Sequence, residues 1–540
     1  MGIFINKGNS SFAESRNGEY VDKSPLIAHI NATLNSERRF SCVTRSRRFG
    51  KSMAAKMLCA YYDRTCDSSG LFADLGIASQ DSETGQFRYP SYPVYLNQFH
   101  VLYVDMTQFV TRYRDTPQDI VARMQADIQT ELLETFGHLT SKPDDDLMLT
   151  LQRTAQATGV KFFVIIDEWD ALFRDFPGYA SAQDEYINLL RRMFKDESAS
   201  AVFAGAYMTG ILPIKKYKTQ SALNNFIEYS MVQPGCMSRY FGFTKDEVLG
   251  ICQRYGMDFD DMEKWYDGYS IGDEQSIFNP NSVMMATINR KCRSFWSATG
   301  SYEQVATYID MNIDGLKDDI IYMLSGGRCA VETSRFANDM HEVKSKDDVF
   351  TVLIHLGYLA YDWNEDACYV PNLEVRKELA SAIQDSGWKV ADAIAKSKEL
   401  LQATLDGDEK AVAAGIDRAH DENTSILSYN DENSLACVIS IAYYYARNEY
   451  VMHRELASGK GFADMVLMPR RHVAKPAMVI ELKYDKEVDA AIAQIKSKRY
   501  EAISRDYTGE VLLVGITYDK ATKRHACRIE KLAEQSLPEG

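Results

Sequence analysis

The feature that most constrains the fold is a set of four continuous apolar runs, separated by helical patterns, in the first part of the chain. Each run is short and lacks the alternation of a half-exposed strand, which is typical of strands covered on both faces in a parallel sheet. Strand, helix and strand repeated in this order predict an α/β domain. The runs are residues 39–46, 101–106, 161–168 and 201–210, and helical stretches such as SMAAKMLCAYY lie between them.

The first run ends in TRSRRFGKSM, which contains the second half of a P-loop, G-x-x-x-x-G-K-[ST]. The start of a helix offers free N–H groups and a positive dipole end to phosphate oxygens. We therefore expect Lys51 to reach the β- and γ-phosphates of ATP and Ser52 to ligate Mg²⁺. Arg45 stands where the motif has its first glycine, and arginine lacks the backbone freedom of glycine. The predicted nucleotide-binding residues of this segment are Arg48, Phe49, Gly50, Lys51, Ser52 and Met53.

Two carboxylates end the third apolar run, in FFVIIDEWD. This is the Walker B pattern, in which Asp167 would hold Mg²⁺ through water and Glu168 would orient or deprotonate the attacking water. An acidic cap at a strand-to-helix turn is the alternative interpretation. Thr209, at the end of the fourth run, is a candidate sensor of the γ-phosphate.

Glu481 and Lys483 interrupt the apolar run AMVIELKYDK near the end of the chain. Side chains alternate between the faces of a strand, so these two share one face. Charges there are costly unless they are paired or bind something. Asp464, in the preceding strand pattern, would converge with them across a hairpin, and two carboxylates can hold divalent ions. A bound metal would lower the pKa of a water, which Lys483 would position; a salt-bridged strand pair is the alternative.

A series of motifs in order along the chain resembles AAA-ATPase-like proteins that are abundant in anaerobic bacteria. In these proteins an ATPase module is joined to a C-terminal PD-(D/E)XK nuclease-like domain. Family members commonly carry RPRRFGKS, so the missing first glycine resembles a family trait, although Ser46 stands where the family has proline. The resemblance rests on EYVDKSPLI, RSRRFGKS, VIIDEWD, TGILPI, ALNNF, YFGFTKDEV, WYDGY and FNPNSV.

The resemblance extends to the carboxylate–lysine region, where Asp464, Glu481, Lys483 and Gln494 match the nuclease motif. It implies catalytic roles for these four residues and Mg²⁺ or Mn²⁺ as the metal. Glu432 begins the preceding helix, where nuclease cores often add a carboxylate ligand. Glu455, just before the first strand, is a further candidate. His453, near Glu455 and Asp464, could approach the metal, but an ordinary surface or core position is the preferred interpretation. WYDGY could stack on a base, but a packed turn is preferred.

These observations predict an α/β protein in four parts. Residues 1–242 would form the AAA-ATPase-like domain with a P-loop NTPase-like parallel sheet, and 243–375 a helical middle region. Residues 376–425 would be a helical connector, and 426–540 the PD-(D/E)XK nuclease-like α/β domain. In the last part, a helix at 435–448 leads into three strand candidates and one more helix.

Composition limits the possible partners. The formal net charge of −15 argues against a general electrostatic grip on nucleic acid. No run of about eighteen apolar residues predicts a membrane span, and ten scattered cysteines without a C-x-x-C pair fit a cytoplasmic protein. The expected partners are ATP and a DNA or RNA substrate, and oligomerisation is left open. The leading hypothesis is an enzyme in which ATP binding or hydrolysis gates a Mg²⁺-dependent phosphodiesterase that acts on nucleic acid. The alternative function is an ATP-responsive switch, or a binding module with an inactive nuclease fold. The atypical P-loop leaves a third option, in which the nucleotide is bound but never hydrolysed.

Overall fold

The computed structural model separates the chain into two compact units. One contains Met1–Ser301 and Ala330–Glu378, and the other contains Tyr302–Cys329 and Leu379–Gly540. The structure describes residues 2–137, 145–214, 216–217, 220–221, 223–296, 307–308, 313–324, 326–337, 343–385, 390–423, 439, 442–443, 445–446, 449–458, 461–470, 473–497 and 509–532. Of these, only the backbone is described for 216–217, 220–221, 275, 315, 317–318, 321, 382–385, 390–395, 421–423, 453–458 and 461–464.

A five-stranded parallel sheet forms the centre of the first unit, as the four apolar runs predicted. Its strand order is β2-β3-β4-β1-β7, so β4 lies between the strand that precedes the P-loop and the strand that carries the two carboxylates. The short edge strand β7 was not indicated by the sequence. The strands are β1 (Phe40–Thr44), β2 (His100–Asp105), β3 (Phe162–Asp167), β4 (Phe203–Gly210) and β7 (Ile227–Tyr229).

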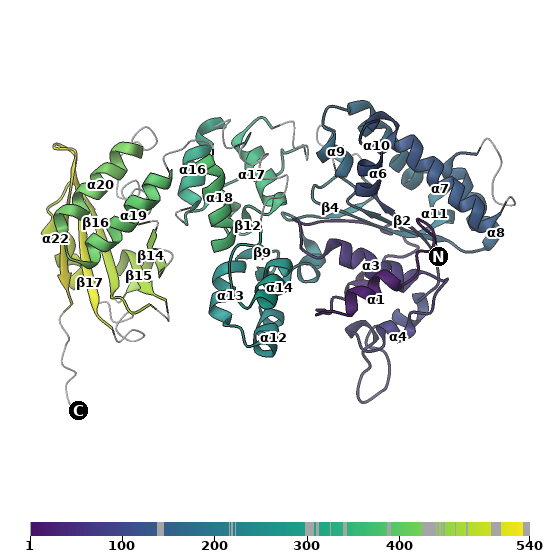
Figure 1. Ribbon diagram of the computed structural model, residues 1–540, viewed down its shortest axis with the longest axis horizontal. Coiled ribbons are helices and arrows are strands. Elements are labelled where there is room, and N and C mark those ends of the chain that lie inside the picture. Colours follow the sequence, from purple (N-terminus) through teal and green to yellow (C-terminus); the bar gives the residue numbers. More distant parts are fainter. Residues whose placement is uncertain are drawn as a thin grey trace. The chain divides into compact units, whose positions relative to one another are not determined.

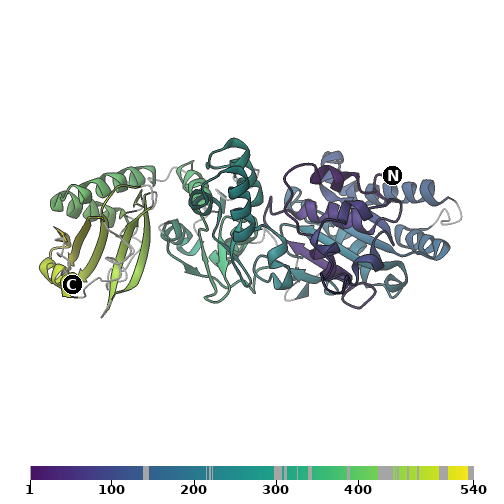
Figure 2. The ribbon, with the colours of Figure 1, turned by 90° about the horizontal axis from the view of Figure 1, so that it is seen from below.

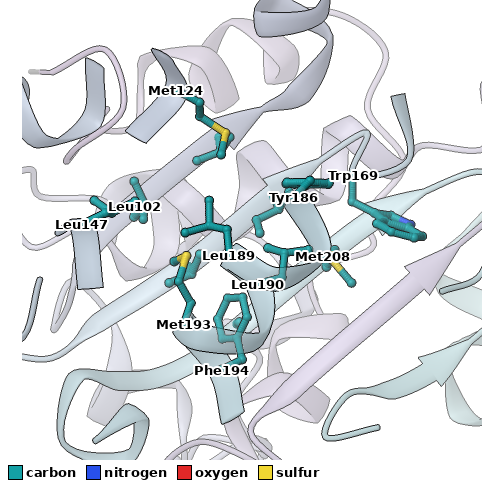
Figure 3. Close-up of a cluster of buried hydrophobic side chains, with 14 of the residues drawn as sticks. Leu102, Met124, Leu147, Trp169, Tyr186, Leu189, Leu190, Met193, Phe194 and Met208 are labelled. Atoms are coloured by element: carbon teal, nitrogen blue, oxygen red, sulfur yellow. The ribbon is translucent and has the colours of Figure 1, made fainter. Parts of the chain in front are cut away.

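Helices cover both faces of this sheet, and Figure 1 shows α1 and α3 on one face and α7 and α10 on the other. Neighbouring residues of a strand enter different cores: Cys42 packs on the α7–α10 side and Val43 on the α3 side. The α7–α10 core is drawn in Figure 3. The helices are α1 (Ser10–Arg16), α2 (Leu26–Asn31), α3 (Lys51–Tyr62), α4 (Ser69–Phe72), α5 (Tyr92–Tyr95), α6 (Met106–Arg112), α7 (Ile120–Phe136), α8 (Leu147–Thr158), α9 (Ala171–Asp175), α10 (Ala180–Lys195) and α11 (Ala199–Val202).

The middle region is mainly helical, as predicted, but it also contains two small three-stranded sheets that the sequence did not indicate. Their orders are β8-β10-β9 and β11-β13-β12. The helices are α12 (Lys245–Tyr255), α13 (Phe259–Tyr266), α14 (Pro280–Asn289), α16 (Leu316–Leu324), α17 (Lys346–Leu356) and α18 (Leu373–Asp385). The strands are β8 (Phe243–Thr244), β9 (Tyr269–Ile271), β10 (Glu274–Phe278), β11 (Cys329–Ala330), β12 (Ala360–Asp362) and β13 (Ala367–Tyr369).

The second unit is built on a mixed five-stranded sheet in the order β14-β15-β16-β17-β18. Only the β16–β17 pair is parallel, and the other pairs are antiparallel. The sequence predicted three of these five strands. They are β14 (Tyr450–Ser458), β15 (Gly461–Pro469), β16 (Ala477–Tyr484), β17 (Val511–Asp519) and β18 (Arg524–Lys531).

Helices also cover both faces of the second sheet (Figure 2). α19 (Val390–Leu405) and α20 (Glu409–Asn423), which the sequence suggested as a connector, share a core with one face of the sheet. α22 (Val488–Ser497) packs on the other face. The predicted helix at 435–448 lies largely outside the described residues. Among the described residues, no helix combines the length and the apolar character needed to cross a bilayer.

Candidate functional sites

The loop after β1 brings the candidate phosphate-binding segment to the start of α3. α3 begins at Lys51, and Gly50 immediately before it has a φ of 90°, a left-handed value that glycine adopts at little steric cost. Arg48 also has a left-handed φ, of 69°. Because the first N–H groups of a helix have no partner within that helix, the loop and the start of α3 together can bind an anion.

Arg45 stands where the P-loop motif has its first glycine, and its side chain has a structural role that the sequence did not indicate. Its side chain is fully buried, and Nη1 donates to the carbonyl oxygens of Thr44 and Tyr229 at 2.8 and 2.9 Å. The guanidinium lies 5.4 Å from the ring centroid of Phe241. Burial lowers the pKa of Arg45 to about 10. Arg45 therefore ties the end of β1 to the neighbouring strand β7.

A chain of ion pairs joins the P-loop to the end of β3. Nζ of Lys51 lies 3.1 Å from the carbonyl oxygen of Ser46 and 3.7 Å from Oε1 of Glu168. Oε2 of Glu168 accepts a hydrogen bond from Nη2 of Arg174 at 2.5 Å. Burial lowers the pKa of Lys51, and the Glu168 carboxylate opposes this change. The two residues predicted as phosphate ligand and general base are therefore in contact.

Asp167 contacts the other predicted metal ligand, Ser52. Burial raises the pKa of Asp167 to about 6, although the hydrogen bond from the Ser52 side chain opposes the change. The Tyr103 hydroxyl donates to Oδ2 of Asp167 at 3.2 Å. A hydroxyl and a carboxylate that meet in this way are oxygen donors of the kind that Mg²⁺ prefers, so this pair fits the predicted metal.

Glu168 has a left-handed backbone, with a φ of 51°. This conformation costs a residue with a Cβ atom about 1–2 kcal/mol, and such strain concentrates at functional sites. Its side chain is 23% exposed, which leaves it accessible from the adjoining space.

A cavity of about 750 Å³ borders the P-loop, a volume within the range of small-molecule sites. All six predicted residues from Arg48 to Met53 line it, together with Glu168. Apolar and aromatic side chains, including Met57 and Phe243, form another part of its lining. The cavity therefore offers both a charged region and an apolar region.

Thr209 and Asp167 are not among the residues that line this cavity. Thr209 is buried at the end of β4, and its hydroxyl donates to the carbonyl oxygen of Val43 at 2.9 Å. The proposed sensor role of Thr209 stays a prediction.

Three cationic residues that line the cavity were not predicted from the sequence as site residues: Lys23, Arg47 and Arg174. Arg174 follows Asp170 by one helical turn, and its Nε forms an ion pair with Oδ2 of Asp170 at 3.0 Å. The spacing of these two residues was a usable signal. The ion pair between Arg174 and Glu168 gave no such signal, because Glu168 precedes α9 and its backbone is left-handed.

The strand β16 separates its side chains onto two faces as expected. Met478, Ile480 and Leu482 enter the core shared with α19 and α20. Ala477 and Val479 pack beneath α22. Alternation therefore places Glu481 and Lys483 on the face that α22 covers.

Glu481, Lys483 and Gln494 meet on this face. Nζ of Lys483 lies 3.2 Å from Oε1 of Glu481, and Nε2 of Gln494 donates to the same oxygen. Glu481 is fully buried and Lys483 is 6% exposed. Gly515 pairs with Glu481 in β17, and a Cβ atom there would lie 3.1 Å from the Cβ of Ala491. The glycine therefore allows α22 to approach the sheet.

The backbone of Asp464 lies in β15. The next residue, Met465, pairs with Ile480, the residue before Glu481. The hairpin therefore brings the Asp464 backbone near Glu481, while its side chain lies outside the described residues, as do the side chains of His453 and Glu455. Glu432 lies outside them entirely. In the part of the chain that the structure describes, no group of three or more His, Cys, Asp or Glu side chains is placed to hold a metal ion.

The WYDGY segment packs into the middle region, in agreement with the preferred interpretation. Tyr266 and Tyr269 are fully buried. Their hydroxyls donate to the carbonyl oxygens of Arg293 and Gly357, at 2.8 and 2.7 Å. These two rings are therefore not available to stack on a base.

Comparison with known proteins agrees with this architecture. Residues 7–219 match the model of a predicted AAA-ATPase family, and residues 430–527 match the model of the PD-(D/E)XK nuclease superfamily. The chain therefore carries an AAA-ATPase-like domain and a C-terminal domain of the PD-(D/E)XK nuclease superfamily, as the motif series indicated.

Individual relatives are distant. A protein of Azotobacter chroococcum mcd 1, described as an uncharacterized protein in the vnfD 5' region, is 24% identical over 304 residues. The match spans 54% of each chain, about half the length of that relative. Two structures of the Aeropyrum pernix ORC2 protein each cover 71% of this chain and 99% of theirs. The ADPNP-ADP complexes align with a TM-score of 0.31 at 11% identity, and the ADP form with 0.27 at 10%.

Proposed function

We propose that the first unit binds and hydrolyses ATP in the cavity beside the P-loop. The observation that carries this proposal is that Lys51, Ser52 and Glu168, predicted from two separate motifs, line one cavity at the start of α3. The free N–H groups of the helix would receive the phosphates, and Lys51 would neutralise their charge.

Ser52 and Asp167 would hold Mg²⁺, because the Ser52 side chain, at the start of α3, hydrogen-bonds to Asp167, at the end of β3. A bound Mg²⁺ supplies positive charge that stabilises the departing phosphate oxygens. Glu168 would accept the proton of the attacking water as the bond between water oxygen and γ-phosphorus forms, while the bond between γ-phosphorus and the β–γ bridging oxygen breaks and ADP leaves. Thr209 would act only through the backbone of β1, to which its hydroxyl is bonded.

The nucleotide proposal is tested by isothermal titration calorimetry of the full chain with Mg²⁺ and a non-hydrolysable ATP analogue. Lys51→Ala is expected to lose measurable binding. Lys56→Ala, on the same helix but outside the cavity lining, is the matched control and should bind normally. Equal binding by Lys51→Ala and the control would remove this half of the proposal.

For the second unit we propose metal-dependent cleavage of phosphodiester bonds in DNA or RNA. It is supported by the contact between Glu481, Lys483 and Gln494 on one face of β16, and by the position of the Asp464 backbone in the paired strand. Glu481 and Asp464 would hold Mg²⁺ or Mn²⁺, with Glu432 as a further ligand. Lys483 and Gln494 would position the attacking water.

The cleavage proposal is tested by incubating the protein with DNA and RNA of varied structure in Mg²⁺ or Mn²⁺. Lys483→Ala should lose cleavage, and the exposed Lys486→Ala should keep it. Equal cleavage by both variants would point to a contaminating nuclease.

The second candidate function is an ATP-responsive binding module whose nuclease fold does not cut. The full burial of Glu481 and its contacts with Lys483 and Gln494 favour this alternative. Retained nucleic-acid binding without cleavage by the wild type, in either metal, would support it.

A further inference from the structure

The carboxylate of Glu168 lies between two cations of the candidate nucleotide site. One oxygen is 3.7 Å from Nζ of Lys51, and the other is 2.5 Å from Nη2 of Arg174. Both cations line the cavity, as Glu168 does. The space between Lys51 and Arg174 is therefore an anion position, which the protein's own carboxylate fills.

Arg174 is held in this position from its other end. Its Nε forms an ion pair with Oδ2 of Asp170 at 3.0 Å, and Asp170 is fully buried. Asp170 also accepts hydrogen bonds from the backbone N–H groups of Ile211 and Leu212, which follow β4. The fold therefore fixes the guanidinium independently of Glu168, whose strained backbone and partial exposure leave it the more replaceable partner.

We propose that Arg174 distinguishes nucleoside triphosphates from diphosphates by exchanging the Glu168 carboxylate for the terminal phosphate. The inference rests on the proposed nucleotide site, in which Lys51 reaches the β- and γ-phosphates. A group between Lys51 and Arg174 is then adjacent to the γ-phosphate position. A terminal phosphate carries more negative charge than a carboxylate and presents oxygens to the planar guanidinium fork.

This exchange has a consequence for the general base. While Glu168 is paired with Lys51 and Arg174, both of its oxygens are engaged by cations and compete poorly for a water proton. When Arg174 binds a terminal phosphate, Glu168 is released toward the cavity. The triphosphate would thus free the base that acts on it, whereas a diphosphate would leave Glu168 paired.

The test measures dissociation constants for ATPγS and ADP, each with Mg²⁺, on the full chain. In the wild type we expect ATPγS to bind about tenfold more tightly than ADP, the size of one charge-assisted hydrogen bond. Arg174→Ala should bring this ratio close to one, and Arg174→Lys should lower it severalfold while keeping a cation beside Asp170. Arg112→Ala is the control, because Arg112 forms an exposed ion pair with Asp127.

Glu168→Gln supplies an independent arm that leaves Arg174 in place. Removing the competing charge should raise the ATPγS-to-ADP preference above the wild-type value. A purely structural ion pair would give the same preference in the wild type, Arg174→Lys and Glu168→Gln, and this result would overturn the inference while the nucleotide site stands. Failure of the wild type to bind either nucleotide would overturn the proposed function and the inference with it.

Discussion

Each of the two units contains a glutamate that is paired with a lysine, but the two pairs have different surroundings. Glu168 follows β3 and Lys51 begins α3, whereas Glu481 and Lys483 both lie in β16. In the first unit, Glu168 and Lys51 are 3.7 Å apart and border a cavity, and Glu168 is 23% exposed. In the second unit, Glu481 and Lys483 are 3.2 Å apart, and Glu481 is fully buried. A ligand can compete for the first pair from the cavity. A metal ion can reach the second only if a side chain around Glu481 moves.

The largest difference between the pairs should be in stability. Lys483→Met removes the ion pair with Lys483 from the fully buried carboxylate of Glu481, and breaking a buried ion pair at one partner costs about 3–5 kcal/mol. Lys51→Met leaves Glu168 paired with Arg174 and removes a cation that burial already disfavours, so we expect a change below about 1 kcal/mol. Denaturant-dependent hydrogen exchange in β16 and in β1 of the full chain measures the two effects separately. Equal losses in both units would remove the distinction.

A smaller effect is expected from Asp167, the metal-ligand candidate of the first unit. Asp167→Asn should stabilise the nucleotide-free protein at neutral pH by about 1–2 kcal/mol, because it removes a buried charge and keeps the shape that accepts from Tyr103. The same variant should weaken Mg²⁺-dependent nucleotide binding. Thermal unfolding and titration calorimetry measure the opposed effects, and a destabilised variant would contradict the account.

The stability difference between Asp167→Asn and the wild type should depend on pH. The pKa of Asp167 in the folded protein, about 6, is higher than that of an ordinary aspartate. Between the two values the folded state binds more protons than the unfolded state, so the contribution of Asp167 to stability falls as the pH rises through this window. The advantage of Asp167→Asn in melting temperature should therefore grow from about pH 4 to pH 6 and then level. Parallel curves would contradict the raised pKa.

Two glycines serve the two sites for different reasons, and the smaller effect is expected at Gly50. Gly515→Ala places a methyl group 3.1 Å from Ala491 and Ile492 of α22, so we expect a loss of about 1–3 kcal/mol from overpacking. Gly50→Ala meets no atom within 4 Å but keeps a left-handed φ, which costs about 1 kcal/mol. The free energies of unfolding of the two variants test whether Gly515→Ala is the more destabilising. A larger loss at Gly50 would show that backbone strain outweighs packing here.

The parallel sheet and both motif-bearing strands were predictable because continuous apolar runs report burial directly. The alternation of side chains between the two faces of a strand also placed Glu481 and Lys483 on one face of β16, which is the face that α22 covers. The edge strand β7 and the small sheets of the middle region were not predictable, since strands of two to five residues leave too short a pattern.

Partners brought together by tertiary structure were also beyond the sequence. Tyr103 reaches Asp167 because β2 and β3 are paired in register. Arg174 pairs with Glu168, which precedes α9 and has a left-handed backbone that the sequence pattern did not indicate. The role of α19 and α20 in the core of the second unit was missed because their polar, Ala-rich pattern resembles that of a connector.

The most direct test of the central claim is a crystal structure of the full chain with Mn²⁺ and a non-hydrolysable ATP analogue. We predict nucleotide in the cavity beside Lys51, with an anomalous manganese signal at Ser52 and Asp167 and with Glu168 separated from Arg174. Nucleotide bound elsewhere, or an empty cavity under saturating analogue, would contradict the claim that this cavity is the ATP site.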